Sequence, residues 1–226
     1  MSFEKSPPIE NMVPAESPSA PENREAEIEK EATDDLNDLG LNWDSLREKM
    51  TLDIGAGPAI IAEVAKKKGV EVISLDKSPE MWAEQEGIKL PNVPYVKADA
   101  EKLPFHDGTF DFVISHAGPL SNVSTKEDVI QVLKEAERVL KNGGEIHFGP
   151  GNLNANIFGS EELFTPEEEE SFTTEERIER IGEKALDFLK SINPNITRDS
   201  IENSSRDYPS KTFYVLRKVF EKAKKK

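Results

Sequence analysis

The chain has 226 residues, a formal net charge of −15 at pH 7, three histidines and no cysteine. The lack of cysteine excludes disulfides, a thiol nucleophile and cysteine-ligated metal clusters, and so few histidines argue against a histidine-rich metal site. The acidic charge argues against nucleic acid as a ligand, because such a field repels phosphate backbones.

Residues 1–40 are predicted to form a disordered acidic tail. They hold eleven Asp or Glu against three Lys or Arg, together with five prolines and almost no apolar periodicity. Such a stretch cannot bury enough apolar surface to offset the loss of chain entropy. We therefore expect one folded domain over residues 41–226, with the tail as a candidate site for a protein partner.

From residue 51 to residue 148 the pattern alternates between strands and helices. Short apolar runs predict the strands, and apolar residues at helical spacing predict the helices. This alternation is typical of a parallel sheet with helices on both faces. Strands are predicted over residues 51–54, 70–75, 93–97, 110–115 and 145–148, and helices over 59–68, from 78 onward and over 129–140.

The C-terminal part is less regular. Residues 173–176 read Thr-Thr-Glu-Glu, which is typical of a capping box at the start of a helix. Two further strands are predicted over 196–201 and 212–220. Residues 152–170 carry apolar side chains with few regular signals, so they are either a lid or acceptor-binding wall, or a surface excursion that packs its own apolar residues.

The five strands of the first part each end in residues suited to binding a ligand. The carboxyl ends of parallel strands share one rim of the sheet, which is where such folds bind ligands. We therefore expect one site for a nucleoside-like ligand. The residues concerned are Asp53 to Gly57 after the first strand, Asp76 after the second, Asp99 after the third, Ser115 and His116 after the fourth, and Gly149 to Gly151 after the fifth.

An ordered series of motifs, at residues 51–57, 72–81, 97–105, 108–115 and 135–144, resembles that of the class I S-adenosylmethionine-dependent methyltransferases. The resemblance covers roughly residues 50 to 150. It implies an α/β, Rossmann-like three-layer sandwich with a mostly parallel seven-stranded sheet and an antiparallel last strand. It also implies S-adenosylmethionine as cofactor, S-adenosylhomocysteine as product, and a short helix over residues 41–49 closing over the cofactor.

The resemblance further implies roles for individual residues. Asp53 would bind the cofactor's amino group, often through water, or orient the glycine turn. Asp76 would accept hydrogen bonds from both ribose hydroxyls, or cap a helix. Asp99 would meet the adenine amino group with the Ala100 amide beside a ring nitrogen, and Met81 or Leu103 would cover a face of the base. The cofactor-binding set is completed by Gly55, Ala56, Gly57, Lys77 and Ser115, and no metal ligand is expected.

Dinucleotide binding is the competing interpretation of the glycine turn. Its fingerprint also follows a first strand and precedes an acidic residue about 20 positions on. That fingerprint requires a glycine at position 60, where this chain has Ile60. The methyltransferase family itself commonly has a third glycine where this chain has Ala59, which is a mild departure.

His116 is the candidate catalytic residue. It is the only histidine predicted on the rim, and its unperturbed pKa near 6.5 suits proton removal at neutral pH. The alternative is a histidine that lines the pocket or makes a structural hydrogen bond. Residues 115–119 read Ser-His-Ala-Gly-Pro and lack the Asn/Asp-Pro-Pro-Tyr signature of amino-group methyltransferases, which favours a small organic acceptor. A protein acceptor stays open.

The expected function is methyl transfer from S-adenosylmethionine to a small organic molecule by in-line displacement. The alternative is a non-catalytic scaffold or regulatory protein that binds the cofactor. No apolar run reaches the roughly 18 to 20 residues that span a bilayer, and no secretory signal is recognisable. We therefore expect a cytoplasmic protein without a membrane span.

Overall fold

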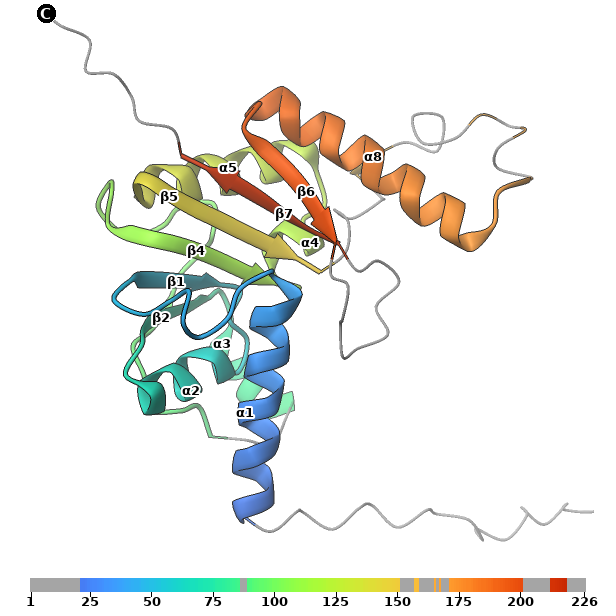
Figure 1. The fold of residues 1–226 in the computed structure, drawn as a ribbon. Coiled ribbons are helices and arrows are strands. Elements are labelled where there is room, and N and C mark those ends of the chain that lie inside the picture. Colours follow the sequence, from blue (N-terminus) through green and yellow to red (C-terminus); the bar gives the residue numbers. More distant parts are fainter. Residues whose placement is uncertain are drawn as a thin grey trace, which may run out of the picture.

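The computed structural model describes residues 21–85, 89–150, 157–158, 165, 167, 171–200 and 212–218. One seven-stranded sheet runs through this part of the chain (Figure 1). Its strands are β1 (Met50–Ile54), β2 (Glu71–Asp76), β3 (Tyr95–Lys97), β4 (Phe110–His116), β5 (Leu140–Gly149), β6 (Ile196–Ser200) and β7 (Thr212–Arg217).

The strands lie in the order β3-β2-β1-β4-β5-β7-β6. All neighbouring pairs from β3 to β5 are parallel, whereas β7 pairs antiparallel with both β5 and β6. This confirms the expected fold class, including the antiparallel last strand.

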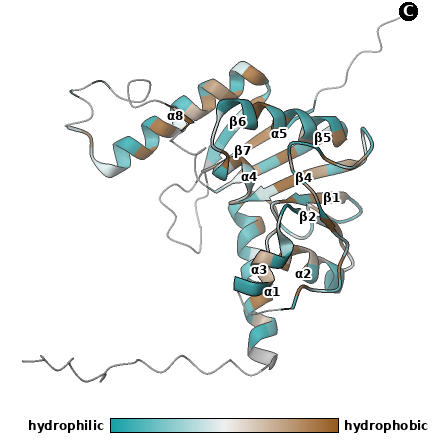
Figure 2. Ribbon diagram, turned by 180° about the vertical axis from the view of Figure 1, so that it is seen from behind, coloured by the Kyte–Doolittle hydropathy of each residue, from teal (hydrophilic) through white to brown (hydrophobic). Residues whose placement is uncertain are grey.

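Helices cover both faces of the sheet. One core cluster joins α1 and α2 to β2 and β4, and a second joins α5 and α8 to the opposite face of the strands (Figure 1). Hydrophobic and hydrophilic residues alternate along α8, as expected for a helix with one buried side (Figure 2). The described helices are α1 (Pro21–Asp38), α2 (Ile60–Lys68), α3 (Pro79–Gln85), α4 (Pro119–Asn122), α5 (Lys126–Val139) and α8 (Thr174–Ile192).

Local signals fix where the helices begin and end. The capping box of α8 is confirmed, since the Glu176 N–H donates to Thr173 Oγ1 at 3.3 Å and the Thr173 N–H donates to the Glu176 carboxylate at 2.7 Å. At the other end of a helix, Gly69 follows α2 in the left-handed conformation, with φ of 69°. None of the described helices has both the length and the apolar character needed to cross a bilayer.

Helix α1 corrects the prediction that residues 1–40 form a disordered tail. From Pro21 to Asp38 the chain is helical, and Ala32, Leu36 and Leu39 are fully buried against α2. The prediction is therefore wrong for residues 21–40, and the folded domain includes a segment before residue 41. Residues 1–20 lie outside the described part of the chain.

The physical reason for this error is a narrow apolar stripe. Residues four positions apart lie on the same side of a helix, so Ala32 and Leu36 share one side, and Leu39 follows directly after the helix. The charged residues between them dominate the average composition and hide the pattern. The short helix expected over residues 41–49 is not formed. These residues make turns before β1 instead.

A histidine in the sheet anchors the end of this helical segment. The His147 Nδ1–H group of β5 donates to the Leu39 carbonyl at 2.9 Å, and Nε2 lies 3.0 Å from the Glu145 carboxylate. His147 is 5% exposed, so this link is buried. It joins the residue just after α1 directly to the middle of the sheet.

Because α1 is part of the core, we expect Leu36→Ala to lower the free energy of unfolding by about 2 to 5 kcal/mol, the usual cost of truncating a buried leucine. Asn37→Ala, at an exposed neighbour on the same helix, should change it by less than about 0.5 kcal/mol. Urea unfolding of both variants measures the difference. Equal stability of the two variants would contradict the packing described for α1.

Candidate functional site

The turn after β1 lies closely packed against the turn after β4. Gly55 has φ of 73°, and a Cβ added there would lie 2.4 Å from Pro119 Cδ, at the start of α4. Glycine is therefore required at this position by both conformation and space. The Gly55 and Ala56 N–H groups both donate to the Leu75 carbonyl, at 2.8 and 3.1 Å, which ties the turn to β2.

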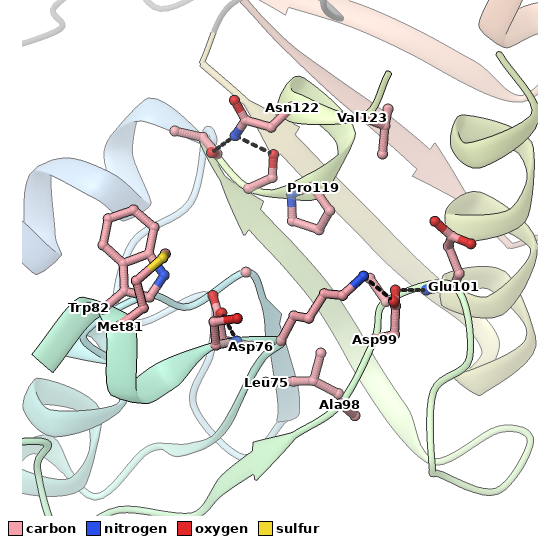
Figure 3. A pocket seen from close by; sticks show the side chains of 16 residues that line it. Leu75, Asp76, Met81, Trp82, Ala98, Asp99, Glu101, Pro119, Asn122 and Val123 are labelled. Atoms are coloured by element: carbon pink, nitrogen blue, oxygen red, sulfur yellow. Dashed lines mark hydrogen bonds and ion pairs between the residues drawn. The ribbon is translucent and has the colours of Figure 1, made fainter. Parts of the chain in front are cut away.

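A first cavity of about 360 Å³ opens beside this turn, at the carboxyl ends of β2, β3 and β4. Figure 3 shows Asp76 between Trp82 and Asp99, with Pro119 and Asn122 of α4 facing them. Six of the residues predicted to bind the cofactor line it, namely Gly55, Asp76, Lys77, Met81, Asp99 and Ala100.

Asp76 is held in place by two backbone groups. Its Oδ2 accepts from the Gly57 N–H at 3.1 Å, and its Oδ1 accepts from the Ser78 N–H at 2.8 Å. Only 8% of the residue is exposed. Each carboxylate oxygen has two lone pairs, so both oxygens can still accept from hydroxyl groups of a ligand.

Asp99 lies across the cavity and carries an ion pair. Lys77 Nζ is 2.7 Å from Asp99 Oδ2, and the Glu101 N–H donates to Oδ1 at 3.1 Å. The hydrogen bond from Lys77 is the main reason why the pKa of Asp99 lies below its usual value. Asp99 is therefore an ionised acceptor at neutral pH.

Arg138 of α5 fixes the segment that follows Ala100. Its guanidinium donates to the Leu103 carbonyl at 2.9 Å and to the Phe105 carbonyl at 2.8 Å. Glu135 pairs with Arg138 and also accepts from the Leu103 N–H at 2.9 Å. The wall of the first cavity is thus braced from a helix behind it.

A second cavity of about 190 Å³ adjoins the first, and both are lined by Gly55, Trp82 and Ala117. The predicted residues Asp53, Ala56, Gly57 and His116 line this second cavity. The structure therefore divides the predicted cofactor-binding set between two adjoining spaces that meet at Gly55.

Asp53 gives the second cavity its electrostatic character. The residue is 3% exposed, and no hydrogen bond reaches its carboxylate from the part of the chain that the structure describes. Burial raises the pKa of Asp53 to about 8, and the carboxylates of Asp35 and Asp76 act in the same direction. A cation or a hydrogen-bond donor in this cavity would relieve that cost.

Sequence reasoning missed the contribution of α1 to this cavity. Glu31 and Asp35 line it, although both were assigned to the tail. Trp82 was missed as well, and it lines both cavities. In the structure Trp82 packs beside Gly57, since a Cβ built at Gly57 would lie 3.7 Å from the indole ring. The motif in the sequence includes its neighbour Met81, and no sequence signal indicates the position of Trp82.

His116 lies on the rim as predicted, in contact with α1. Its Nδ1 is 3.4 Å from Asp35 Oδ1, and its Nε2 is 3.5 Å from Asp38 Oδ2. The two carboxylate side chains are 9% and 1% exposed, and that of His116 is 11% exposed. Both ring nitrogens therefore face carboxylates of the helix.

Ser115 is the one predicted residue that the structure does not bring to either cavity. The residue is 1% exposed, and a Cβ added at Gly118 would lie 2.3 Å from its hydroxyl oxygen. The Ser115 side chain is thus buried beneath the turn after β4.

Most of the predicted lid over 152–170 lies outside the described residues, as does Gly151. Two apolar residues of that stretch are described. Phe158 is 7% exposed and packs edge-on against Phe188 of α8, with 5.9 Å between the ring centroids, and Ile157 is 9% exposed.

Comparison with known proteins identifies proteins that are similar to part of this chain. Residues 52–148 match the family model described as a methyltransferase domain. The chain is 40% identical over 99 residues to a demethylmenaquinone methyltransferase from Chlorobaculum tepidum, covering 43% of this chain and 39% of the relative. It is 28% identical over 135 residues to a ubiquinone biosynthesis O-methyltransferase from Acinetobacter baylyi, covering 54% of each. The chain thus matches about half or less of the length of these relatives.

A solved structure shares the fold over most of its length. It is a putative S-adenosyl-L-methionine-dependent methyltransferase from Methanococcus maripaludis, with 19% identity and a TM-score of 0.50. The similarity covers 89% of this chain and 93% of that chain. The shared architecture therefore extends beyond the segment that the sequence comparisons match.

The raised pKa of Asp53 predicts a pH-dependent stability. The folded protein holds a proton on Asp53 up to a pH of about 8, whereas the unfolded chain loses this proton near pH 4. The protonated side chain therefore contributes its full share of the folding stability below pH 4. That contribution falls as the pH rises and is lost as the pH passes through 8. We expect Asp53→Asn to remove this loss and to raise the Tm at pH 8 by several degrees, since about 1 kcal/mol corresponds to about 2 to 4 °C for a chain of this size.

Thermal unfolding of both proteins from pH 5 to pH 8 measures the effect. The gap between the two Tm values should widen as the pH rises. Parallel Tm curves for the wild type and Asp53→Asn would contradict the raised pKa.

Proposed function

Because residues 52–148 match the family model of a methyltransferase domain, we propose that the chain is a class I S-adenosylmethionine-dependent methyltransferase, which moves a methyl group from S-adenosylmethionine to a small organic acceptor and releases S-adenosylhomocysteine. The observation that carries this proposal is the pair of adjoining cavities. One presents Asp76, Asp99 and Ala100, and the other presents Asp53. This division fits a ligand in which a nucleoside is joined to a cationic amino acid.

The nucleoside half of the cofactor fits the first cavity. The ribose hydroxyls would donate to the free lone pairs of Asp76, which backbone N–H groups already orient. The adenine amino group would donate to Asp99, with the Ala100 amide beside a ring nitrogen. Lys77 is already paired with the Asp99 carboxylate. Adenine would therefore either share this carboxylate with Lys77 or displace the lysine from it.

The amino-acid half fits the second cavity. Its ammonium group would donate to Asp53, whose carboxylate lacks a donor among the described residues. Its carboxylate would meet the first-turn N–H groups of α2 at Ile60 and Ile61, since both residues line the cavity and the first N–H groups of a helix have no partner within it.

For methyl transfer the protein mainly has to position the two reactants. The sulfonium group of the cofactor supplies an activated methyl group, so the protein's task is to align the acceptor and exclude water. The reacting bond would lie where the two cavities meet, between Gly55, Trp82 and Ala117.

The catalytic role of His116 stays a prediction. A base is needed only if the acceptor atom must lose a proton. Both nitrogens of the ring face Asp35 and Asp38, which supports a role in holding α1 at the rim.

The relatives bear on the class of acceptor. Their names refer to demethylmenaquinone and to ubiquinone biosynthesis, and the two proteins are a methyltransferase and an O-methyltransferase. Both names support a small organic molecule as the acceptor proposed for this chain.

The proposal is tested by calorimetric titration of S-adenosylmethionine and S-adenosylhomocysteine into the wild type and Asp76→Ala. We expect micromolar binding to the wild type, about −8 kcal/mol, and at least a tenfold loss in the variant, because Asp76 both meets the ligand and holds the Gly57 amide. Asp44→Ala, which removes an aspartate that is 83% exposed, is the control and should bind as the wild type does. A folded wild-type protein that binds neither ligand would refute the proposed function.

A further inference from the structure

We propose that Asp35 of α1 is a second carboxylate for the cofactor's ammonium group, acting together with Asp53. The inference rests on the proposed function and adds to it a contact from a segment outside the residues that match the family model, 52–148. It assigns α1 a part in binding as well as in folding.

The first support is the composition of the second cavity. Asp53 and Asp35 both line it, and they are 3% and 7% exposed. The two carboxylates are close enough for Asp35 to raise the pKa of Asp53. No Lys or Arg is among the described residues that line this cavity, so an ammonium group of a ligand would meet carboxylates there and no competing lysine or arginine from these residues.

The second support is the missing donor at Asp53. A buried carboxylate normally has a hydrogen-bond donor, and an uncompensated one is costly. The Asp53 carboxylate has none within the described part of the chain, although it lines the cavity. This side chain is therefore positioned for a donor that the ligand brings.

The chemistry of an ammonium group matches two carboxylates. A protonated amine has three N–H donors and no acceptor, so it can donate to Asp53 and Asp35 at once. Charge-assisted hydrogen bonds of this kind are the stronger ones in proteins. A ligand without the amino group would gain nothing from either residue.

His116 is one of the neighbours of Asp35 in the structure. Its Nδ1 is 3.4 Å from Asp35 Oδ1, near the upper limit for a hydrogen bond. Its Nε2 faces Asp38 at 3.5 Å, and the side chain of Asp38 is 1% exposed. The histidine thus has a carboxylate on each side, so it keeps one when Asp35 turns to the ligand.

Asp38 makes a matched control for Asp35. The two aspartates lie three residues apart on α1, both are buried and both face His116. Only Asp35 lines the cavity. Each substitution to asparagine removes one negative charge beside the same imidazole, but only one of them removes a carboxylate from the proposed ammonium site.

The test is calorimetric titration of wild type, Asp35→Asn and Asp38→Asn with S-adenosylhomocysteine and with its analogue lacking the amino group. We expect Asp35→Asn to weaken S-adenosylhomocysteine by about 10- to 100-fold, in line with the loss of a hydrogen bond to a charged group. Its affinity for the analogue should stay within about threefold of the wild-type value. Asp38→Asn should change neither affinity by more than about threefold.

Three results would overturn the inference. The first is an equal loss of both ligands in Asp35→Asn, which would indicate displacement of α1 rather than a lost contact. The second is a loss in Asp38→Asn as large as in Asp35→Asn, and the third is unchanged S-adenosylhomocysteine affinity in Asp35→Asn. The third result, with intact wild-type binding, leaves the proposed function standing, whereas a wild type that binds nothing refutes both proposals.

A second variant guards against misfolding. If Asp35→Asn does not fold, Asp35→Glu keeps the charge and moves the carboxylate by one methylene. We expect Asp35→Glu to weaken S-adenosylhomocysteine and to leave the analogue unaffected. An equal effect on both ligands would count against the contact here too.

Discussion

The close approach of two glycine turns, one after β1 and one after β4, fixes where a ligand can bind. A Cβ on Gly55 would collide with Pro119, and a Cβ on Gly118 would lie 2.6 Å from the Ile54 carbonyl oxygen. These turns end neighbouring strands at the point where the order of the sheet reverses, since β2 follows on one side of β1 and β5 on the other side of β4. Such a reversal opens a crevice at the carboxyl ends of the strands. Both cavities adjoin Gly55, so the whole site depends on this contact.

The electrostatics of the site follow from which side of the sheet each residue faces. Side chains alternate along a strand, so Asp53 and His116 lie on the same side as α1, with Ile114 packed against that helix cluster. Burying several carboxylates there destabilises the protein when no ligand is bound. Functional sites commonly reduce stability in this way, and a cationic ligand restores it by binding only the folded state.

Much of the sheet and of the first cavity was predictable, because the relevant residues form contiguous motifs at strand ends. The rule that parallel strands share a carboxyl edge brings Asp76 and Asp99 together, whereas Ala100 was expected from the family resemblance. Ser115 was predicted to bind the cofactor, but it lines neither cavity. Side chains alternate along a strand, so only one of Ser115 and His116 can face α1, and the sequence does not indicate which of the two it is.

The parts that were not predictable depend on contacts between distant segments. Asp35 reaches the site only because a narrow apolar stripe packs α1 against α2, and Trp82 only because α3 lies against the glycine turn.

The position of β7 bears on how this sheet is completed during synthesis. β7 follows β6 in the chain, yet it lies between β5 and β6 and pairs with both. Until β7 has been made, β5 has an open edge with unpaired backbone groups, and β6 has no partner to join it to the sheet. An open edge of this kind is a template for pairing with other chains. The nascent protein therefore passes through an aggregation-prone stage that ends only when its seventh strand inserts.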